Sequence, residues 1–243
     1  MSEGGKTAIE ANDEVVSVAE VKALKKRIRQ LEHEPLIKRV ITFVEDLGAQ
    51  ITFIIRKKDN DDFFLKDTLK ILCPEAQVIM TEDLTKGAAC SALYAIDIIN
   101  NDQELIILNG DQLITGSLSA AVENFRSRSL DGGILVFNAV HPRWSYVLLN
   151  DAGDVVQTSE KRPISNIATA GCYYFKAGAD FVQACFSIIR KDVNVKGNYF
   201  VSSTYNELIL EDKKIGVYEI NKKDYLSFAT YHLYESYLKE KEK

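Results

Sequence analysis

The sequence predicts an α/β fold in which a mixed, mainly parallel sheet is flanked by helices. Short runs of β-branched and apolar residues occur at 51–55, 77–80 and 104–108, as expected of buried strands. Between these runs lie segments whose apolar residues recur every three or four positions, as on one face of a helix. Because alternating strands and helices favour parallel pairing, we expect ligands to bind at the carboxyl ends of the strands.

Length and composition indicate one ordinary domain. The chain has 243 residues, 46% of them hydrophobic, which is enough to bury a substantial core. No linker or shift in composition divides it, so we expect a single domain over 1–243 with a divergent N-terminal segment at 1–34. No apolar run reaches the ~18 residues of a spanning helix, and no signal peptide follows Met1. We therefore expect a cytoplasmic protein that does not associate with membranes.

Charge and cysteine usage narrow the classes of partner. A net charge of −5 without a long basic block argues against nucleic-acid binding, although a local basic pocket for a phosphorylated small molecule stays open. The cysteines lie far apart and the histidines lack metal-ligand spacing. We expect free, buried thiols rather than disulfides or metal ligands.

Local patterns define the elements of the first half. An amphipathic helix is expected at 35–47, where apolar residues recur every three or four positions and Gly48 follows as a stop. Small residues begin a second helix at 87–99, so that its N-terminus can approach a neighbour closely. The remaining elements are strands at 51–55, 77–80, 104–108 and 133–138, and helices at 67–72 and 117–127.

The second half of the sequence predicts a hairpin as well as alternating strands and helices. A polar turn at 150–154 separates two apolar runs and predicts an antiparallel hairpin. A charged amphipathic helix at 231–243 can pack on its own sheet or on a second copy, so a homo-oligomer stays open. The remaining elements are strands at 171–175 and 215–220, and helices at 180–191 and 202–210.

Asp111 is the strongest candidate for a functional residue. It follows the apolar strand 104–108 in a tight Asn109-Gly110-Asp111 turn. A carboxylate there can hold a hard cation such as Mg²⁺ while substrate phosphates complete its coordination. An aspartate that only caps the turn or the next helix would give the same pattern, and the residues alone favour neither reading.

Two further segments suit phosphorylated ligands. In Glu160-Lys161-Arg162-Pro163, two cations stand beside an acid, so that Lys161 suits a phosphate and Glu160 and Asn166 suit hydroxyls. A solvated charged loop is the commoner explanation of such charges. In the segment 84–89, small residues allow a ligand to approach backbone N–H groups, although close helix–sheet packing also explains them.

These segments, together with 205–209, resemble the sugar-phosphate nucleotidyltransferases in sequence and order. The resemblance extends from about Pro35 to about Ile220 and is most specific between Glu160-Lys161-Arg162-Pro163 and the strand 171–175. It is closest to the branch found in capsule and surface-polysaccharide clusters, which 141–146 also matches.

The resemblance implies a GT-A-like, Rossmann-like fold and a reaction. A nucleoside monophosphate passes from CTP, UTP or dTTP to a phosphorylated sugar-like acceptor, and pyrophosphate is released in polysaccharide precursor synthesis. The residues implied by the match are Asp111 for Mg²⁺ and catalysis, Gly87, Ala88 and Gly110 for the nucleotide, Lys161 for catalysis and the acceptor phosphate, and Glu160, Asn166 and Gly171 for the rest of the acceptor pocket.

The N-terminus departs from the family pattern. Family members begin with a strand and a Gly-x-Gly-Thr/Ser-Arg loop that wraps the triphosphate, whereas 11–18 contains no glycine, no arginine and two acids. In an ungapped register, Lys26 stands near the loop lysine of the family and is a further catalytic candidate. Ser227 stands where many members place a second metal-binding aspartate.

Two functions therefore stay open. The first is the family's enzymatic activity. The second is a catalytically silent homologue that binds sugar phosphate or nucleotide sugar as a regulatory subunit. A glycosyltransferase is less favoured, because Asp111-Gln112-Leu113 lacks the usual Asp-x-Asp metal motif.

Overall fold

The computed structural model describes residues 36–82 and 84–228, all within one unit of the chain, Glu34–Lys243. Lys26, the rest of the N-terminal segment 1–34 and the expected helix at 231–243 lie outside these residues. No helix in the described ranges is long and apolar enough to span a membrane.

A two-stranded parallel sheet forms the first part of the fold. Strand β1 pairs in register with β2, from Thr52 opposite Gln77 to Arg56 opposite Thr81. Helix α3 between them is not evident from the sequence, because its segment Lys-Lys-Asp-Asn-Asp-Asp-Phe is polar and buries no residue. The elements are α2 (Leu36–Glu45), β1 (Thr52–Arg56), α3 (Lys57–Phe63), α4 (Leu65–Leu72) and β2 (Gln77–Thr81).

The helix expected at 87–99 is divided into three short pieces. They are α5 (Ala88–Ala92), the 3-10 turn η1 (Leu93–Ala95) and α6 (Ile96–Ile99). The small residues that begin this segment allow α5 to pack closely, and Ala89 is fully buried. The elements that follow are β3 (Leu105–Leu108), β4 (Gln112–Ile114), α7 (Leu118–Ser127), β5 (Gly132–Asn138), β6 (Ser145–Leu149) and β7 (Val155–Glu160).

The larger sheet has six strands in the order β7-β6-β8-β5-β9, and β3 also pairs with β8. The central strand β8 is antiparallel to all three of its neighbours. A short antiparallel ribbon joins β4 to β10. The last elements are β8 (Ile167–Phe175), α8 (Gly178–Arg190), α9 (Val201–Leu210), β9 (Ile215–Glu219), η2 (Lys222–Asp224) and β10 (Tyr225–Ser227).

The mixed α/β class with flanking helices is confirmed, but the expectation of mainly parallel pairing is wrong. Within the described residues, parallel pairing is confined to β1–β2 and β5–β9. The hairpin β6–β7 reverses the chain, and β8 then runs back between strands that all point the other way. Strand–helix alternation in the first half therefore does not determine the pairing of β3 and β5.

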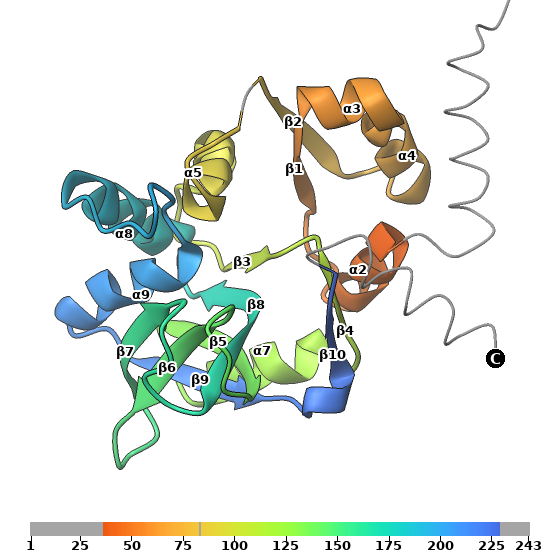
Figure 1. Cartoon of the computed structure of the whole chain (residues 1–243). Coiled ribbons are helices and arrows are strands. Elements are labelled where there is room, and N and C mark those ends of the chain that lie inside the picture. The colour runs from red at the N-terminus through yellow and green to blue at the C-terminus, as the bar shows by residue number, and fades with distance from the viewer. Residues whose placement is uncertain (1–35, 83, 229–243) are drawn as a thin grey trace, which may run out of the picture. The chain divides into compact units, whose positions relative to one another are not determined.

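Apolar residues fill both faces of the larger sheet. Successive residues of β5 alternate between the faces, so that Ile134 and Val136 pack with α8 and α9, whereas Leu135 and Phe137 pack with α7. Figure 1 shows α8 and α9 on one side of this sheet and α7 on the other. Cys172 and Cys185 are buried free thiols as expected, whereas Cys73 and Cys90 are half-buried.

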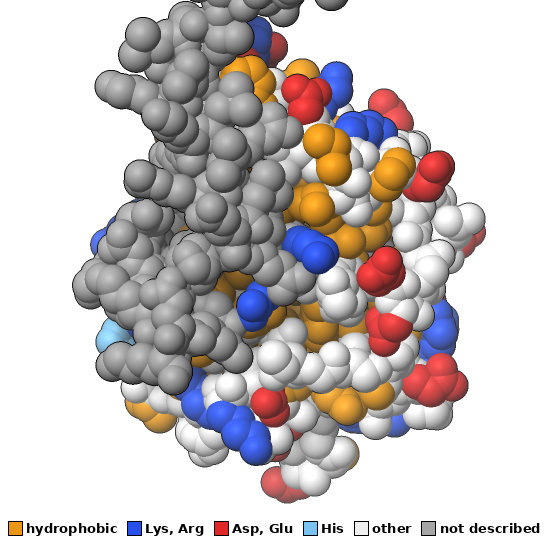
Figure 2. Space-filling view, turned by 90° about the vertical axis from the view of Figure 1, so that its right-hand side faces the viewer, with side chains coloured by type: hydrophobic (Ala, Val, Ile, Leu, Met, Phe, Trp, Pro, Cys, Tyr) orange, Lys and Arg blue, Asp and Glu red, His pale blue; other side chains and the backbone are white. Residues whose placement is uncertain are grey.

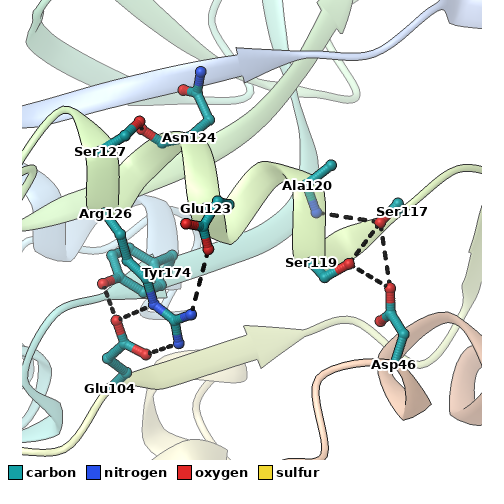
Figure 3. Close-up of polar contacts among 10 residues, drawn as sticks. All are labelled: Asp46, Glu104, Ser117, Ser119, Ala120, Glu123, Asn124, Arg126, Ser127 and Tyr174. Atoms are coloured by element: carbon teal, nitrogen blue, oxygen red, sulfur yellow. Dashed lines mark hydrogen bonds and ion pairs between the residues drawn. The ribbon is translucent and has the colours of Figure 1, made fainter.

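Helix α7 is attached to its neighbours at both ends (Figure 3). At its C-terminal end, Arg126 Nε donates to the Glu104 carboxylate at 2.9 Å, and the Tyr174 hydroxyl donates to the same carboxylate at 2.7 Å. At its N-terminal end, the Ser119 hydroxyl donates to Asp46 at 2.7 Å. Ser117 caps the helix by accepting from the Ala120 N–H. These contacts attach α7 to Glu104, which precedes β3, and to Asp46, which follows α2.

Candidate functional site

Asp111 lies in the turn between β3 and β4, where its backbone is fixed and its side chain is exposed. The Asp111 carbonyl accepts a hydrogen bond from the Phe228 N–H at 2.7 Å. Within residues 36–82 and 84–228, no hydrogen bond or ion pair engages the carboxylate. It caps no helix, because a strand follows it and Ser117 caps α7. Among the described residues, nothing therefore competes with a ligand for this carboxylate.

Gly171 packs against the same turn. Its φ is +64°, and its carbonyl accepts from the Asn109 N–H at 3.0 Å. A Cβ at this position would overlap the side-chain amides of Asn109 and Gln112. Positive φ favours glycine here, and a Cβ would also force the two amides to shift. Gly171 therefore holds β8 against the turn that carries Asp111.

Gln112 presents a buried donor beside Asp111. Its side chain is 2% exposed, its Oε1 accepts from the Tyr225 hydroxyl at 3.4 Å, and its Nε2 has no partner among the described residues. An unsatisfied buried amide is costly, so such groups in native proteins often serve a ligand or water. Burial raises the pKa of the Tyr225 hydroxyl well above its usual range, which keeps that hydroxyl a donor.

Glu160 ends β7 with its carboxylate turned inward. The carboxylate accepts hydrogen bonds from the hydroxyls of Ser145 and Ser202, the latter at 3.0 Å. Burial raises the pKa of Glu160, and the two serine hydroxyls and the Lys161 charge oppose that rise. The described contacts of this carboxylate hold it in one orientation.

Lys161 and Asn166 present exposed polar groups on the following loop. Lys161 has a φ of +54°, and its N–H donates to the Trp144 carbonyl at 3.0 Å. Its ammonium lies 5.0 Å from the centre of the Phe200 ring. The Asn166 carbonyl accepts from the Ala139 N–H at 3.0 Å, and its side chain is exposed. Backbone bonds thus fix a loop whose polar ends face solvent.

Gly87 is required by close packing at the start of α5. Its φ is +97°, and a Cβ would overlap the backbone of Tyr199. The Ala89 N–H donates to the Tyr199 carbonyl at 3.2 Å, and the Tyr199 N–H donates to the Lys86 carbonyl at 2.8 Å. Close helix packing therefore explains this glycine without a ligand.

Two cavities adjoin this point. One, of about 270 Å³, is lined in the described residues by parts of β1 and by Thr81, Gly87, Ala88 and Ser91, among others. The other, of about 860 Å³, lies between β1 and β3 and extends from α4 and α5 to Asn109 and Gly110. Among the described residues, β1 pairs only with β2 and β3 only with β8, so strand edges face this larger cavity. Figure 2 views the right-hand side of the molecule in Figure 1, where α3 and α4 lie, and shows apolar side chains among charged ones.

The structure brings most of the sequence-predicted residues into two groups. Gly87, Ala88 and Gly110 line the two cavities, and Asp111 is the next residue after Gly110. Glu160 and Lys161 form the second group, next to Trp144 and Ser145. Gln112 could not be predicted as a site residue, because nothing in a sequence reveals an amide buried without a partner. The same holds for Ser145 and Ser202, which approach Glu160 only in the fold.

With the fold and both groups of residues described, the comparisons identify the family of this chain. The model of the Nucleotidyl transferase family matches residues 21–221, and the chain belongs to this family. No curated protein matches.

Solved structures of the same fold include three with related names. A nucleoside-diphosphate-sugar pyrophosphorylase from Vibrio cholerae RC9 is 20% identical, with a TM-score of 0.71 over 85% of this chain and 88% of that one. A putative glucose-1-phosphate thymidylyltransferase from Bacillus anthracis is 15% identical, with a TM-score of 0.64 over 83% and 80%. The inositol-1-phosphate CTP transferase from T. maritima is 15% identical, with a TM-score of 0.64 over 84% and 80%.

Proposed function

We propose that this chain transfers a nucleoside monophosphate from an NTP to a sugar phosphate. An oxygen of the acceptor phosphate attacks the α-phosphorus, the bond from that phosphorus to the bridging oxygen breaks, and pyrophosphate leaves. The observation that carries this proposal is the exposed Asp111 carboxylate, free of described partners, which follows a glycine that lines the larger cavity. The family and the names of the structural neighbours support the reaction class.

We assign the nucleotide to the side of Gly87, Ala88 and Gly110. A Cβ on Gly110 would meet nothing within 4 Å, so packing does not explain this glycine as it explains Gly87. The absent side chain leaves room for a ligand beside Asp111. CTP, UTP and dTTP are the expected nucleotides, in line with the thymidylyl and CTP transferases among the neighbours.

We assign the acceptor to the side of Glu160 and Lys161. The Lys161 ammonium is exposed and suits a phosphate, while the oriented Glu160 carboxylate suits a sugar hydroxyl. Asn166 adds an exposed amide, and Gly171 fixes the strand beneath. The product would be a nucleotide sugar for capsule or surface polysaccharide, made in the cytoplasm.

The residues around Asp111 fit Mg²⁺. Among the described residues, no group of three acidic, histidine or cysteine side chains could hold a metal. Mg²⁺ usually takes only one or two carboxylates, and water and substrate phosphates supply the other oxygens. When bound, the ion would neutralise phosphate charge. Asp111 is its expected protein ligand, and Lys26 is a further expected cation for the triphosphate.

Release of pyrophosphate tests the proposal. The full-length protein with Mg²⁺ is incubated with CTP, UTP or dTTP and a panel of sugar 1-phosphates and polyol phosphates. Pyrophosphate that depends on one acceptor is expected. If no pair reacts but sugar phosphate or nucleotide sugar binds in calorimetry, the silent regulatory homologue replaces the enzyme.

A further inference from the structure

Three buried aromatic rings lie next to both groups of the candidate site. The Phe137 and Tyr225 rings stack with centroids 4.5 Å apart, and Trp144 meets Phe137 edge-on at 5.5 Å and Tyr225 at 5.4 Å. All three side chains are at most 9% exposed. We name Phe137, Trp144 and Tyr225 the ring cluster.

Two cations lie over the ring cluster. The Lys222 ammonium is 4.1 Å from the Phe137 centroid, 5.2 Å from that of Trp144 and 5.4 Å from that of Tyr225. The Arg143 guanidinium carbon is 4.3 Å from the Trp144 centroid. The faces of aromatic rings attract cations, so these contacts hold both flexible side chains in place.

Neither cation has an acidic partner in residues 36–82 and 84–228. Among the described residues, the two positive charges therefore share one ring without a counter-ion, and like charges at short range repel each other. Burial, and then the neighbouring Arg143 charge, lower the pKa of Lys222, as expected of a cation that lacks a counter-ion. An anion that contacts both groups would relieve this repulsion through charge-assisted hydrogen bonds.

The ring cluster is connected to both parts of the proposed site. The Trp144 carbonyl accepts from the Lys161 N–H, and the next residue, Ser145, donates to Glu160. On the other side, the Tyr225 hydroxyl donates to Gln112, the residue after Asp111. The two cations are thus held near the acceptor loop and near the turn that carries Asp111.

We propose that Arg143 and Lys222 form an anion site for an acidic group of the acceptor, a phosphate or carboxylate other than the phosphate assigned to Lys161. This inference rests on the proposed function and specifies its substrate class: an acceptor with two anionic groups. Arg143 supplies a planar fork of donors and Lys222 a point charge, a pair suited to a tetrahedral or planar anion.

The tryptophan of the ring cluster provides a direct probe. Trp144 is the only tryptophan in the chain, so intrinsic fluorescence reports on the proposed site. Inorganic phosphate is titrated at constant ionic strength into the full-length protein and into Arg143→Gln and Lys222→Gln. A saturable change in the fluorescence of Trp144 is expected in the wild type. The dissociation constant should be at least ~10-fold larger in each variant. Lys222→Arg should restore binding, and Lys223→Gln, which removes the same charge one residue on, should leave it unchanged.

Two pairs of ligands show whether the bound anion belongs to the acceptor or to the nucleotide. Calorimetry compares glucose 1,6-bisphosphate with glucose 1-phosphate, and UTP with UMP. A preference for the bisphosphate that disappears in Lys222→Gln supports the proposal. The proposal is overturned if phosphate does not bind the wild type, or if the Gln variants bind phosphate as tightly as the wild type. It is also overturned if the Gln variants lose affinity for UTP alone. These measurements require no turnover, so failure of pyrophosphate release would refute the proposed reaction without deciding the anion site.

Discussion

The Ser202 hydroxyl donates a 3.0 Å hydrogen bond to the Glu160 carboxylate, and thereby joins helix α9 to the end of β7. Ser202 is 1% exposed, and Ser145 donates to the same carboxylate from β6. Three elements thus determine where this acid lies. Because these contacts orient the Glu160 carboxylate without a ligand, their contribution can be measured as protein stability, separately from ligand binding.

Removal of the Ser202 hydroxyl should destabilise the protein. We expect Ser202→Ala to lower the free energy of unfolding by about 1–3 kcal/mol, because a buried carboxylate loses a donor. Denaturant unfolding measures the effect. Ser203→Ala is the control on the same helix, since no described hydrogen bond involves its hydroxyl, and equal losses in both variants would contradict the account.

The burial of Glu160 should appear as a pH dependence of stability. The pKa of Glu160 is higher in the folded than in the unfolded state, so protonation of this carboxyl stabilises the fold. This stabilisation is complete below the unfolded pKa of about 4.3. It is lost as the pH rises through the folded pKa. Glu160→Gln should therefore match the wild type near pH 4 and exceed it by on the order of 1 kcal/mol at pH 7. Thermal unfolding across this range tests the sign, with exposed Glu75→Gln as the control. If Glu160→Gln became less stable relative to the wild type as the pH rises, the pKa of Glu160 would be lowered in the folded state, which contradicts this prediction.

Two glycines should respond differently to alanine. Gly87→Ala is expected to cost about 2–4 kcal/mol, because positive φ and overlap with the Tyr199 backbone both oppose a Cβ. Gly110→Ala should change stability by less than about 1 kcal/mol, since its Cβ meets nothing within 4 Å, but should weaken nucleotide binding. Unfolding curves and UTP calorimetry distinguish the two. A stable Gly87→Ala variant would show that the close packing is not needed.

The hydroxyl of Tyr174 should contribute to the attachment of α7 (Figure 3). Tyr174→Phe removes its bond to Glu104 but keeps its ring, which stacks on Phe125 with centroids 5.3 Å apart. A loss of about 0.5–1.5 kcal/mol in unfolding free energy is expected. Tyr218→Phe is the control, because Tyr218 also contacts Phe125 but its hydroxyl makes no described bond. No difference between the two variants would refute this role.

Local patterns predict most elements of the fold but not how the strands pair. The amphipathic period of α2 and the β-branched run of β1 are local properties, and both lie within two residues of their expected bounds. The direction of β8 depends on long-range pairing with β3 and β5, to which no local pattern corresponds. Helix α3 escapes prediction because it has no buried face.

The candidate site divides in the same way. Residues that carry chemistry in their own side chains, such as Asp111 and Lys161, can be selected from the sequence. Residues defined by their neighbours cannot be selected in this way. Gln112 matters because its amide is buried, and Lys222 because its ammonium lies over the rings of the ring cluster. The sequence alone also does not reveal that Gly87 is required by its close approach to the Tyr199 backbone, whether or not it binds a ligand.

The role of Asp111 is tested most directly by Asp111→Asn in the pyrophosphate-release assay, with the nucleotide and acceptor pair that reacts with the wild type and with Mg²⁺ varied. We expect a loss of at least ~10³-fold in kcat/KM with an unchanged melting temperature, because the carboxylate has no described structural partner. Asp102→Asn, an exposed acid before β3, should retain full activity. Wild-type rates in Asp111→Asn would contradict the assignment of this carboxylate and the function built on it.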